Sequence, residues 1–314
     1  MTATMTPKVA PAAVTDVEDG AAAVVPRPAG RRVREPLGPT LAALTACMIS
    51  VSVVCLWFLA QTLLLGSLTH NRTQTELYDQ LRSSLADGTA PTGGVIDPGA
   101  PVALLSIPTI HVQEVVVEGT SSVDTLGGPG HRRNTVLPGQ PGVSVVMGRA
   151  TTYGAPFGDV TSLQPGDRLT ATTALGVSTF RVERIRRDGD PVPAPLADGA
   201  GRLTLVTGEG SGTLSALRPA STVYVDAALT SAALPLPAGR PGTVPTAELE
   251  MGTDPSALPL VTLGFAALLG LVVGCFRAAA QWRPVLVWTV AAPVALAVAW
   301  WTTDLVMRTL PNLF

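Results

Sequence analysis

Charged side chains are scarce in this chain of 314 residues, at 14%, and aromatic side chains make up only 4%. Soluble domains carry charge on roughly 25% of their residues. Because 46% of the residues are hydrophobic, a single soluble globule would lack the polar surface to cover its core, so part of the chain is expected in lipid. The formal net charge of −2 excludes the basic footprint that nucleic-acid binding needs.

Cysteine is limited to three residues, and all of them lie in long apolar runs. They are Cys47, Cys55 and Cys275. The polar stretch between these runs therefore has no disulfide, no thiolate metal site and no cysteine nucleophile. The three histidines follow no metal-ligand spacing. They are His70, His111 and His131. We expect neither a metal nor a cofactor.

Three apolar runs are long enough to cross a hydrocarbon core about 30 Å thick. They cover residues 41–66, 257–276 and 284–303. The short connector 277–283 makes the last two runs a helical hairpin. Gln61 is the strongly polar side chain of the first run; it either hydrogen-bonds across to the last two helices or is a bystander near the interface. The sequence thus predicts three transmembrane α-helices.

The arginines predict the orientation of these helices, because cytoplasmic flanks carry an excess of positive charge. One group precedes the first run, and a second group flanks the connector. The groups are Arg27, Arg31, Arg32 and Arg34, and Arg277 and Arg283. Residues 1–40 are then a disordered cytoplasmic tail, and 277–283 is a cytoplasmic turn. Residues 67–256 and a short tail, 304–314, are extracytoplasmic, so the protein is a multi-pass protein of the cell membrane.

The extracytoplasmic part divides at two linkers rich in Gly, Pro and Ala. Residues 67–101 are a juxtamembrane helix, strongest over 71–86, followed by a linker, and residues 228–256 are a second linker. Between them, residues 102–227 have the length of one domain and read as seven short Val- and Thr-rich strands, which suggests a closed barrel or a sandwich. The strands are 102–107, 111–119, 143–148, 167–174, 177–185, 202–207 and 221–227.

Five motifs in order within residues 102–227 resemble those of the sortase family, the transpeptidases that attach proteins to Gram-positive cell walls. The chain has IPTI at 107–110, GGPGHRRNTVLPGQPG at 127–142, VSVVMGRATTYGAPFGDVTSLQPGDRL at 143–169, LTLVTGEG at 203–210 and ALRPASTVYVDA at 216–227. The third motif contains a form of F-x-x-L-x-x-G-D with an altered spacing, which comprises Phe157, Leu163, Gly166 and Asp167. The loop 127–142 is similar to that of class E members. The resemblance implies an all-β, sortase-like closed barrel of about 7–8 strands.

The resemblance also implies where catalytic residues would lie. The family uses a cysteine nucleophile, a histidine that protonates the leaving amine and an arginine that steadies the substrate. This chain has Gly208 at the cysteine position, Arg149 at the histidine position and Arg218 at the arginine position. Glycine offers no nucleophile, and an arginine does not exchange protons at physiological pH. No catalytic residue is therefore expected.

Other residues of this region leave two interpretations open. Thr207 and Ser211 flank the missing cysteine, and His131 is a candidate base, so a relocated nucleophile is one interpretation; ordinary loop hydroxyls are the other. Arg149 and Arg218, with Thr207, either bind an anion such as a peptide carboxylate or pair with neighbouring acids and solvent.

Two functional hypotheses follow from the motifs and the missing thiol. The first is a catalytically inactive pseudo-sortase, a membrane-anchored binding or scaffolding module for sorting-motif peptides, peptidoglycan precursors or another membrane protein. The second is a divergent sortase-type transpeptidase or hydrolase that uses a relocated nucleophile. Because no cysteine lies outside the apolar runs, the sequence favours the first.

Overall fold

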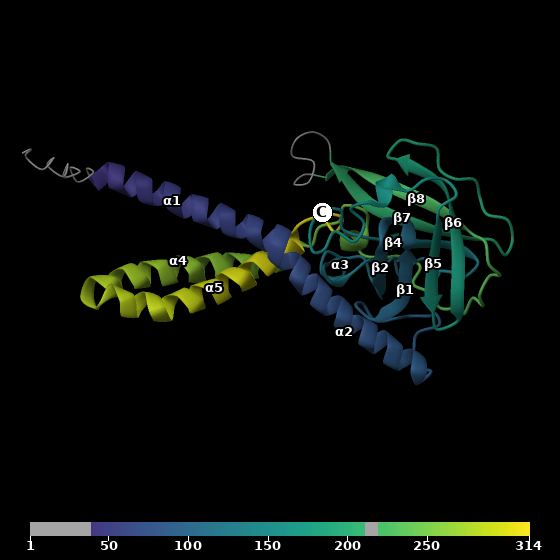
Figure 1. The fold of residues 1–314 in the computed structure, drawn as a ribbon, viewed down its shortest axis with the longest axis horizontal. Coiled ribbons are helices and arrows are strands. Elements are labelled where there is room, and N and C mark those ends of the chain that lie inside the picture. The colour runs from purple at the N-terminus through teal and green to yellow at the C-terminus, as the bar shows by residue number, and fades with distance from the viewer. Residues whose placement is uncertain (1–38, 211–218) are drawn as a thin grey trace, which may run out of the picture. The chain divides into compact units, whose positions relative to one another are not determined.

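The computed structural model describes residues 39–210 and 219–314, and eight strands within them close into a barrel (Figure 1). The order of the strands around the barrel is β1-β2-β3-β4-β7-β8-β6-β5. Their bounds are β1 Pro101–Ile107, β2 Val112–Glu118, β3 Gly130–His131, β4 Gly142–Met147, β5 Arg168–Thr173, β6 Gly176–Arg187, β7 Gly201–Gly210 and β8 Pro219–Leu229. A closed order leaves no unpaired sheet edge.

The seven strands predicted from the sequence are confirmed to within a few residues at each end. The strand β3 is not among the predictions, because two residues are too few to show alternation. The long strand β6 illustrates why the pattern is informative: Phe180 and Val182 are buried in the barrel core, whereas Val177 and Arg181 between and beside them are exposed. Successive side chains of a strand point to opposite faces, so one face of β6 faces the core.

The strands β4 and β7 pair in parallel, as do the short partners β2 and β3. The register of β4 with β7 runs from Gly142 opposite Gly201 to Met147 opposite Val206. On its other side β7 pairs antiparallel with β8 over most of its length. Parallel neighbours need a long crossover between them, and residues 148–200, which include β5 and β6, supply it. The ends of β4 and β7 therefore meet at one end of the barrel.

Helices flank the barrel in the sequence, and all of them except α2 are apolar. They are α1 Pro39–Ala60, the π-helical turn η1 Gln61–Leu65, α2 Gly66–Ala86, α4 Leu258–Gln281 and α5 Pro284–Thr309. A one-turn helix, α3 Asp124–Gly127, follows β2. The chain is helical over the predicted range 71–86, and this helix begins earlier, at Gly66. Its position beside a membrane stays a prediction.

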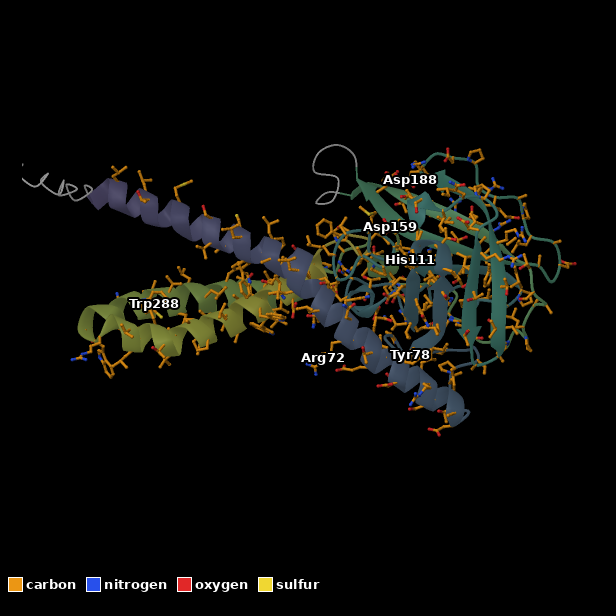
Figure 2. The ribbon with its side chains drawn as sticks, in the orientation of Figure 1. Arg72, Tyr78, His111, Asp159, Asp188 and Trp288 are labelled. Carbon is orange, nitrogen blue, oxygen red and sulfur yellow. The ribbon has the colours of Figure 1, made fainter. Side chains whose placement is uncertain are left out.

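Two helices within the described residues are long and apolar enough to cross a membrane, at Pro255–Cys275 and Val285–Thr309. They coincide with the two C-terminal runs that the sequence predicts as spans. Side chains along them are largely exposed, as Trp288 is (Figure 2), which suits contact with lipid. The span predicted for residues 41–66 is not among them and stays a prediction; the cytoplasmic tail predicted for residues 1–40 lies, through residue 38, outside the described residues.

The side chain of Gln61 makes no hydrogen bond in the described structure, although it is fully buried. The hydrogen bond from Gln61 to the last two helices, one of the two roles predicted for this residue, is therefore absent from the described residues. Trp57 makes that connection instead, since its Nε1 donates to Thr303 Oγ1 at 3.1 Å. The first apolar helix is thus joined to α5 one turn before the π-helical turn.

The segment between β8 and α4 lies against the barrel. Arg240 pairs with the buried Glu118 of β2 at 2.5 Å, and Glu248 pairs with Arg133. The Thr120 hydroxyl donates to Glu248 O at 2.6 Å. The chain predicted as the linker 228–256 therefore contributes ion pairs to the barrel wall, a role that its Pro, Ala and Gly content does not indicate.

Gly148, the residue after β4, packs against the barrel core with no room for a side chain. A Cβ built there would lie 2.5 Å from ring atoms of Phe157, which is fully buried. We predict that Gly148→Ala lowers the free energy of unfolding by about 1–3 kcal/mol, the usual cost of overpacking a core. Thermal and denaturant unfolding of the full chain in detergent measures this loss.

The matched control is Gly242→Ala, because a Cβ at Gly242 meets nothing within 4 Å. Its unfolding should stay within about 0.5 kcal/mol of the unaltered chain. Equal stability of the two variants would contradict the packing argument.

Candidate functional site at the ends of β4 and β7

The parallel pair of β4 and β7 brings together the two positions singled out from the sequence. Beyond the last strand pair, the Gly148 amide donates to Val206 O at 2.9 Å. The Thr207 hydroxyl donates back to Gly148 O at 3.0 Å, across 59 residues of sequence. Arg149 and Gly208 are the residues that follow this bonded pair on each strand, so both lie at this end of the barrel. Their correspondence to the histidine and cysteine positions of the family stays a prediction.

The Arg149 side chain is fully buried, and all five of its guanidinium hydrogens meet protein oxygens. The acceptors are Thr125 O at 3.2 Å from Nε, Thr152 Oγ1 at 3.2 Å and Phe314 O at 3.3 Å from Nη1, and Ser122 O and Ser122 Oγ, each 2.9 Å from Nη2. Burial lowers the pKa of Arg149 to about 10, which leaves the guanidinium charged at neutral pH. Such a group binds oxygens strongly but is a poor proton donor in catalysis.

No side chain at the end of β7 offers an activated nucleophile within the described residues. Gly208 has no side chain and is buried where it pairs with Thr222 of β8. Thr207 is 1% exposed, and its hydroxyl is already a donor to Gly148 O. Arg218 and Ser211, named above from the sequence, lie outside the described residues. The proposed ligand contacts of Arg149, Arg218 and Thr207 remain predictions.

The candidate base His131 is enclosed in the barrel wall. Its Nδ1 lies 2.8 Å from Glu118 Oε2, and its Nε2 lies 2.8 Å from Val136 O and 3.2 Å from Thr135 Oγ1. The ring is fully buried. Both nitrogens therefore have protein partners that tie β3 to β2 and to the following loop, so His131 is placed as a structural residue.

The model of the sortase domain family matches residues 105–221. The barrel is a sortase-family domain. Among solved structures, the chain is similar to sortase E from Streptomyces avermitilis, with 29% identity and a TM-score of 0.37, covering 44% of this chain and 93% of that one. No curated protein matches the chain.

Two clostridial structures are also similar to this chain. The sortase D5 transpeptidase of Clostridium perfringens has 22% identity and a TM-score of 0.42, covering 52% of this chain and 100% of that one. A sortase C of Clostridium perfringens, solved with the C-terminal cell wall sorting motif, has 20% identity and a TM-score of 0.37, covering 51% of this chain and 89% of that one.

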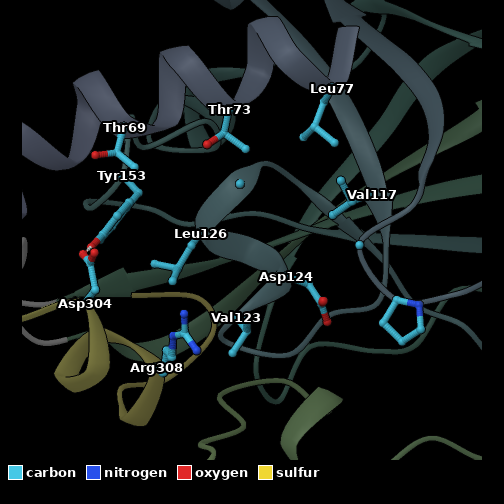
Figure 3. Close-up of a pocket in the computed structure, with 13 residues that line it drawn as sticks. Thr69, Thr73, Leu77, Val117, Val123, Asp124, Leu126, Tyr153, Asp304 and Arg308 are labelled. Carbon is cyan, nitrogen blue, oxygen red and sulfur yellow. Dashed lines mark hydrogen bonds between the residues drawn. The ribbon is translucent and has the colours of Figure 1, made fainter. Parts of the chain in front are cut away.

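A cavity of about 470 Å³ lies beside the sortase-family barrel, between α2, α3, β2 and α5 (Figure 3). Tyr153 and Asp304 meet at its wall, where the Tyr153 hydroxyl donates to Asp304 Oδ1 at 2.8 Å. The Tyr153 ring lies 5.8 Å from the Arg149 guanidinium carbon. Burial, followed by the charge of Asp304, raises the pKa of Tyr153 well above its usual value. The phenol therefore stays protonated and acts as a hydrogen-bond donor.

The segment 304–314, which the sequence predicts as a short extracytoplasmic tail, contributes to the site. Phe314 O accepts hydrogen bonds from Arg149 and from Thr152 Oγ1, and Leu313 packs on Met147 and is fully buried. The sequence gives one weak indication of this burial, the two apolar residues Leu313 and Phe314 in the predicted tail. Within the described residues no group of three metal-ligating side chains is present.

We predict that Arg149→Lys destabilises the chain by about 2–4 kcal/mol, because a lysine carries three donors on one atom and cannot reach five separated acceptors. Denaturant unfolding of the full chain measures the loss. The exposed Arg181 on β6 is the matched position, and Arg181→Lys should change stability by less than about 0.5 kcal/mol. A similarly small effect of Arg149→Lys would show that its hydrogen bonds contribute little.

The carboxyl of Asp124, in α3 at the cavity wall, should make the stability of the chain depend on pH. Burial raises the pKa of its carboxyl, although bonds from the Ser121 amide and hydroxyl oppose that shift. Between the ordinary and the raised pKa the folded chain binds more protons than the unfolded chain, so the contribution of Asp124 to stability falls as pH rises through that range. Asp124→Asn should remove this dependence, so its stability relative to the unaltered chain should increase as pH rises above the ordinary pKa of an aspartate.

Unfolding of both chains at several pH values tests this expectation. The control is Asp159→Asn, which alters an exposed carboxyl (Figure 2). If the difference in the free energy of unfolding between Asp124→Asn and the unaltered chain does not change with pH, or changes in the opposite direction, the pKa of Asp124 is not raised.

Proposed function

We propose that this chain is a membrane-anchored pseudo-sortase, a binding or scaffolding module with a sortase-family domain and no covalent chemistry. The proposal is supported by the absence of a thiol at Gly208, two residues before the end of β7, and by Arg149, two residues after the end of β4, at the positions where the resemblance implies a cysteine and a histidine. Acyl transfer of the sortase type needs a thiolate at that place. No cysteine lies in the chain between residues 56 and 274.

The state of Arg149 supports the same proposal. An acid that protonates a leaving amine must hold a proton it can release and recover near the operating pH. Arg149 is charged with a pKa of about 10, and its hydrogens are engaged by five oxygens. It is therefore a residue that positions segments of this chain.

The proposed ligands are peptides of the sorting-motif type, cell-wall precursors or a partner membrane protein. The helices Pro255–Cys275 and Val285–Thr309, together with the predicted span at 41–66, would anchor the chain in the membrane of a Gram-positive cell. The arginines that flank these runs support a cytoplasmic N-terminus and an extracytoplasmic barrel. A module in that position would meet secreted peptides and wall polymers at the membrane surface.

The competing function is a transpeptidase or hydrolase with a relocated nucleophile. Thr207 is the described hydroxyl nearest in sequence to Gly208, and its burial and its bond to Gly148 O leave no base poised to activate it. The assay described next distinguishes this function from the pseudo-sortase.

We predict that the full chain in detergent forms no product from an LPxTG-type peptide and a glycine-peptide amine. Intact-mass spectrometry should find no acyl adduct after long incubation, since no thiolate is available to attack the peptide. Peptide cleavage, transfer or an adduct on any side chain would contradict the proposal.

The controls for this assay are a catalytically active sortase and the double variant Arg149→His with Gly208→Cys. The active sortase shows that peptide and acceptor are competent. Turnover by the double variant, with none by the unaltered chain, would locate the loss of activity in these two side chains. Turnover by the unaltered chain at the same rate as the variant would establish the relocated-nucleophile function.

A further inference from the structure

The chain turns back onto the sortase-family barrel directly after α5 ends at Thr309. Asn312 and Leu313 are fully buried, and Phe314 is 8% exposed. Leu313 packs on Met147 and Val206, with Tyr224 beside them. These barrel residues alternate with core residues of the same strands, so Leu313 covers the outer face of β4, β7 and β8.

The segment Leu310–Phe314 is held by hydrogen bonds of its main chain and of Asn312. The Asn312 amide nitrogen donates to Gly252 O at 3.0 Å. Its side-chain Nδ2 donates to Thr120 O at 2.6 Å and to Leu249 O at 2.9 Å. Its side-chain oxygen is buried with no partner within the described residues. The fit is therefore close but incomplete.

Three donors from the loop after β4 are aimed at main-chain oxygens of this segment. Ala150 N donates to Leu313 O at 3.2 Å. Arg149 Nη1, at 3.3 Å, and Thr152 Oγ1, at 2.6 Å, both donate to Phe314 O. We call these three residues, with Met147 and Val206, the seat.

The seat has the chemistry of a peptide-binding site. A main-chain amide, a cation and a hydroxyl recognise peptide oxygens, and an apolar surface takes a leucine side chain. If Leu310–Phe314 left, Ala150 N and Thr152 Oγ1 would lose these acceptors, and the apolar face of Met147 and Val206 would be exposed. Any peptide that restores these contacts is a competing ligand.

We propose that the seat is a peptide-binding site that the chain fills in cis with Leu310–Phe314, and that a peptide with a leucine next to a free main-chain oxygen binds it in trans when that segment is released. This inference rests on the proposed function, because it names the ligand class and the regulation of the same site. A tethered segment acts at an effective concentration of about 1 mM. A trans peptide with a Kd near 10 μM would thus bind the occupied chain about 100-fold more weakly.

The test measures fluorescence anisotropy of the labelled peptide Leu-Pro-Asn-Leu-Phe with full chain in detergent and with a chain that lacks residues 310–314. We expect binding to the shortened chain and about 100-fold weaker binding to the unaltered chain. Thr152→Val in the shortened chain, or a peptide whose second leucine is replaced by aspartate, should weaken binding at least ten-fold.

Three outcomes would overturn the inference. They are no binding to the shortened chain, equal binding to both chains, and binding that is insensitive to both Thr152→Val and the aspartate peptide. If the shortened chain does not bind the peptide, the proposal that the chain lacks catalysis still stands. If the unaltered chain turns over peptide, the proposed function is wrong, but the shortened chain can still bind the peptide.

A second variant covers the case in which the shortened chain does not fold. Asn312→Ala removes two hydrogen bonds of the segment and should raise peptide affinity several-fold over the unaltered chain. It should also speed hydrogen exchange of the Ala150 amide, while amides of core strand β7 stay unchanged. If Ala150 exchanges only when the core unfolds, the segment is a permanent part of the fold and the inference fails.

Discussion

The hydrogen bonding of one buried cation, Arg149, constrains most of the structure around the candidate site. A charge removed from water is costly unless each of its donors is matched. Here the matching oxygens come from the residues before and within α3, from the loop after β4 and from Phe314. These segments must keep their positions for the guanidinium to keep its hydrogen bonds, so Arg149 acts as a structural centre.

The same arrangement separates the fold from its chemistry. The parallel register of β4 and β7 depends on main-chain bonds and on core side chains such as Val146 and Leu205, and neither needs a reactive residue at the strand ends. A barrel can therefore keep the shape of a sortase-family domain while the atoms at the site change. The described part of the site holds hydrogen-bond donors and an apolar surface formed by Met147 and Val206.

The helical hairpin and the site are connected by short-range contacts. The Tyr153 hydroxyl binds Asp304 of α5, and the Ser122 hydroxyl donates to Met307 O at 3.0 Å. Both residues also lie against Arg149, through the ring of Tyr153 and the oxygens of Ser122. A displacement of α5 would thus disturb the hydrogen bonds of Arg149 before it reached the barrel core.

Much of the architecture is determined by the sequence alone, because strand alternation, apolar run length and turn residues are local properties. The apolar runs 257–276 and 284–303 and seven of the strands follow from local patterns. The five acceptors of Arg149, the enclosure of His131 between Glu118 and Val136, and the seating of Leu313 on β4 and β7 were decided by tertiary structure. Each depends on groups far apart in the chain that meet only after the barrel closes, and no local pattern specifies which buried donor will find which oxygen.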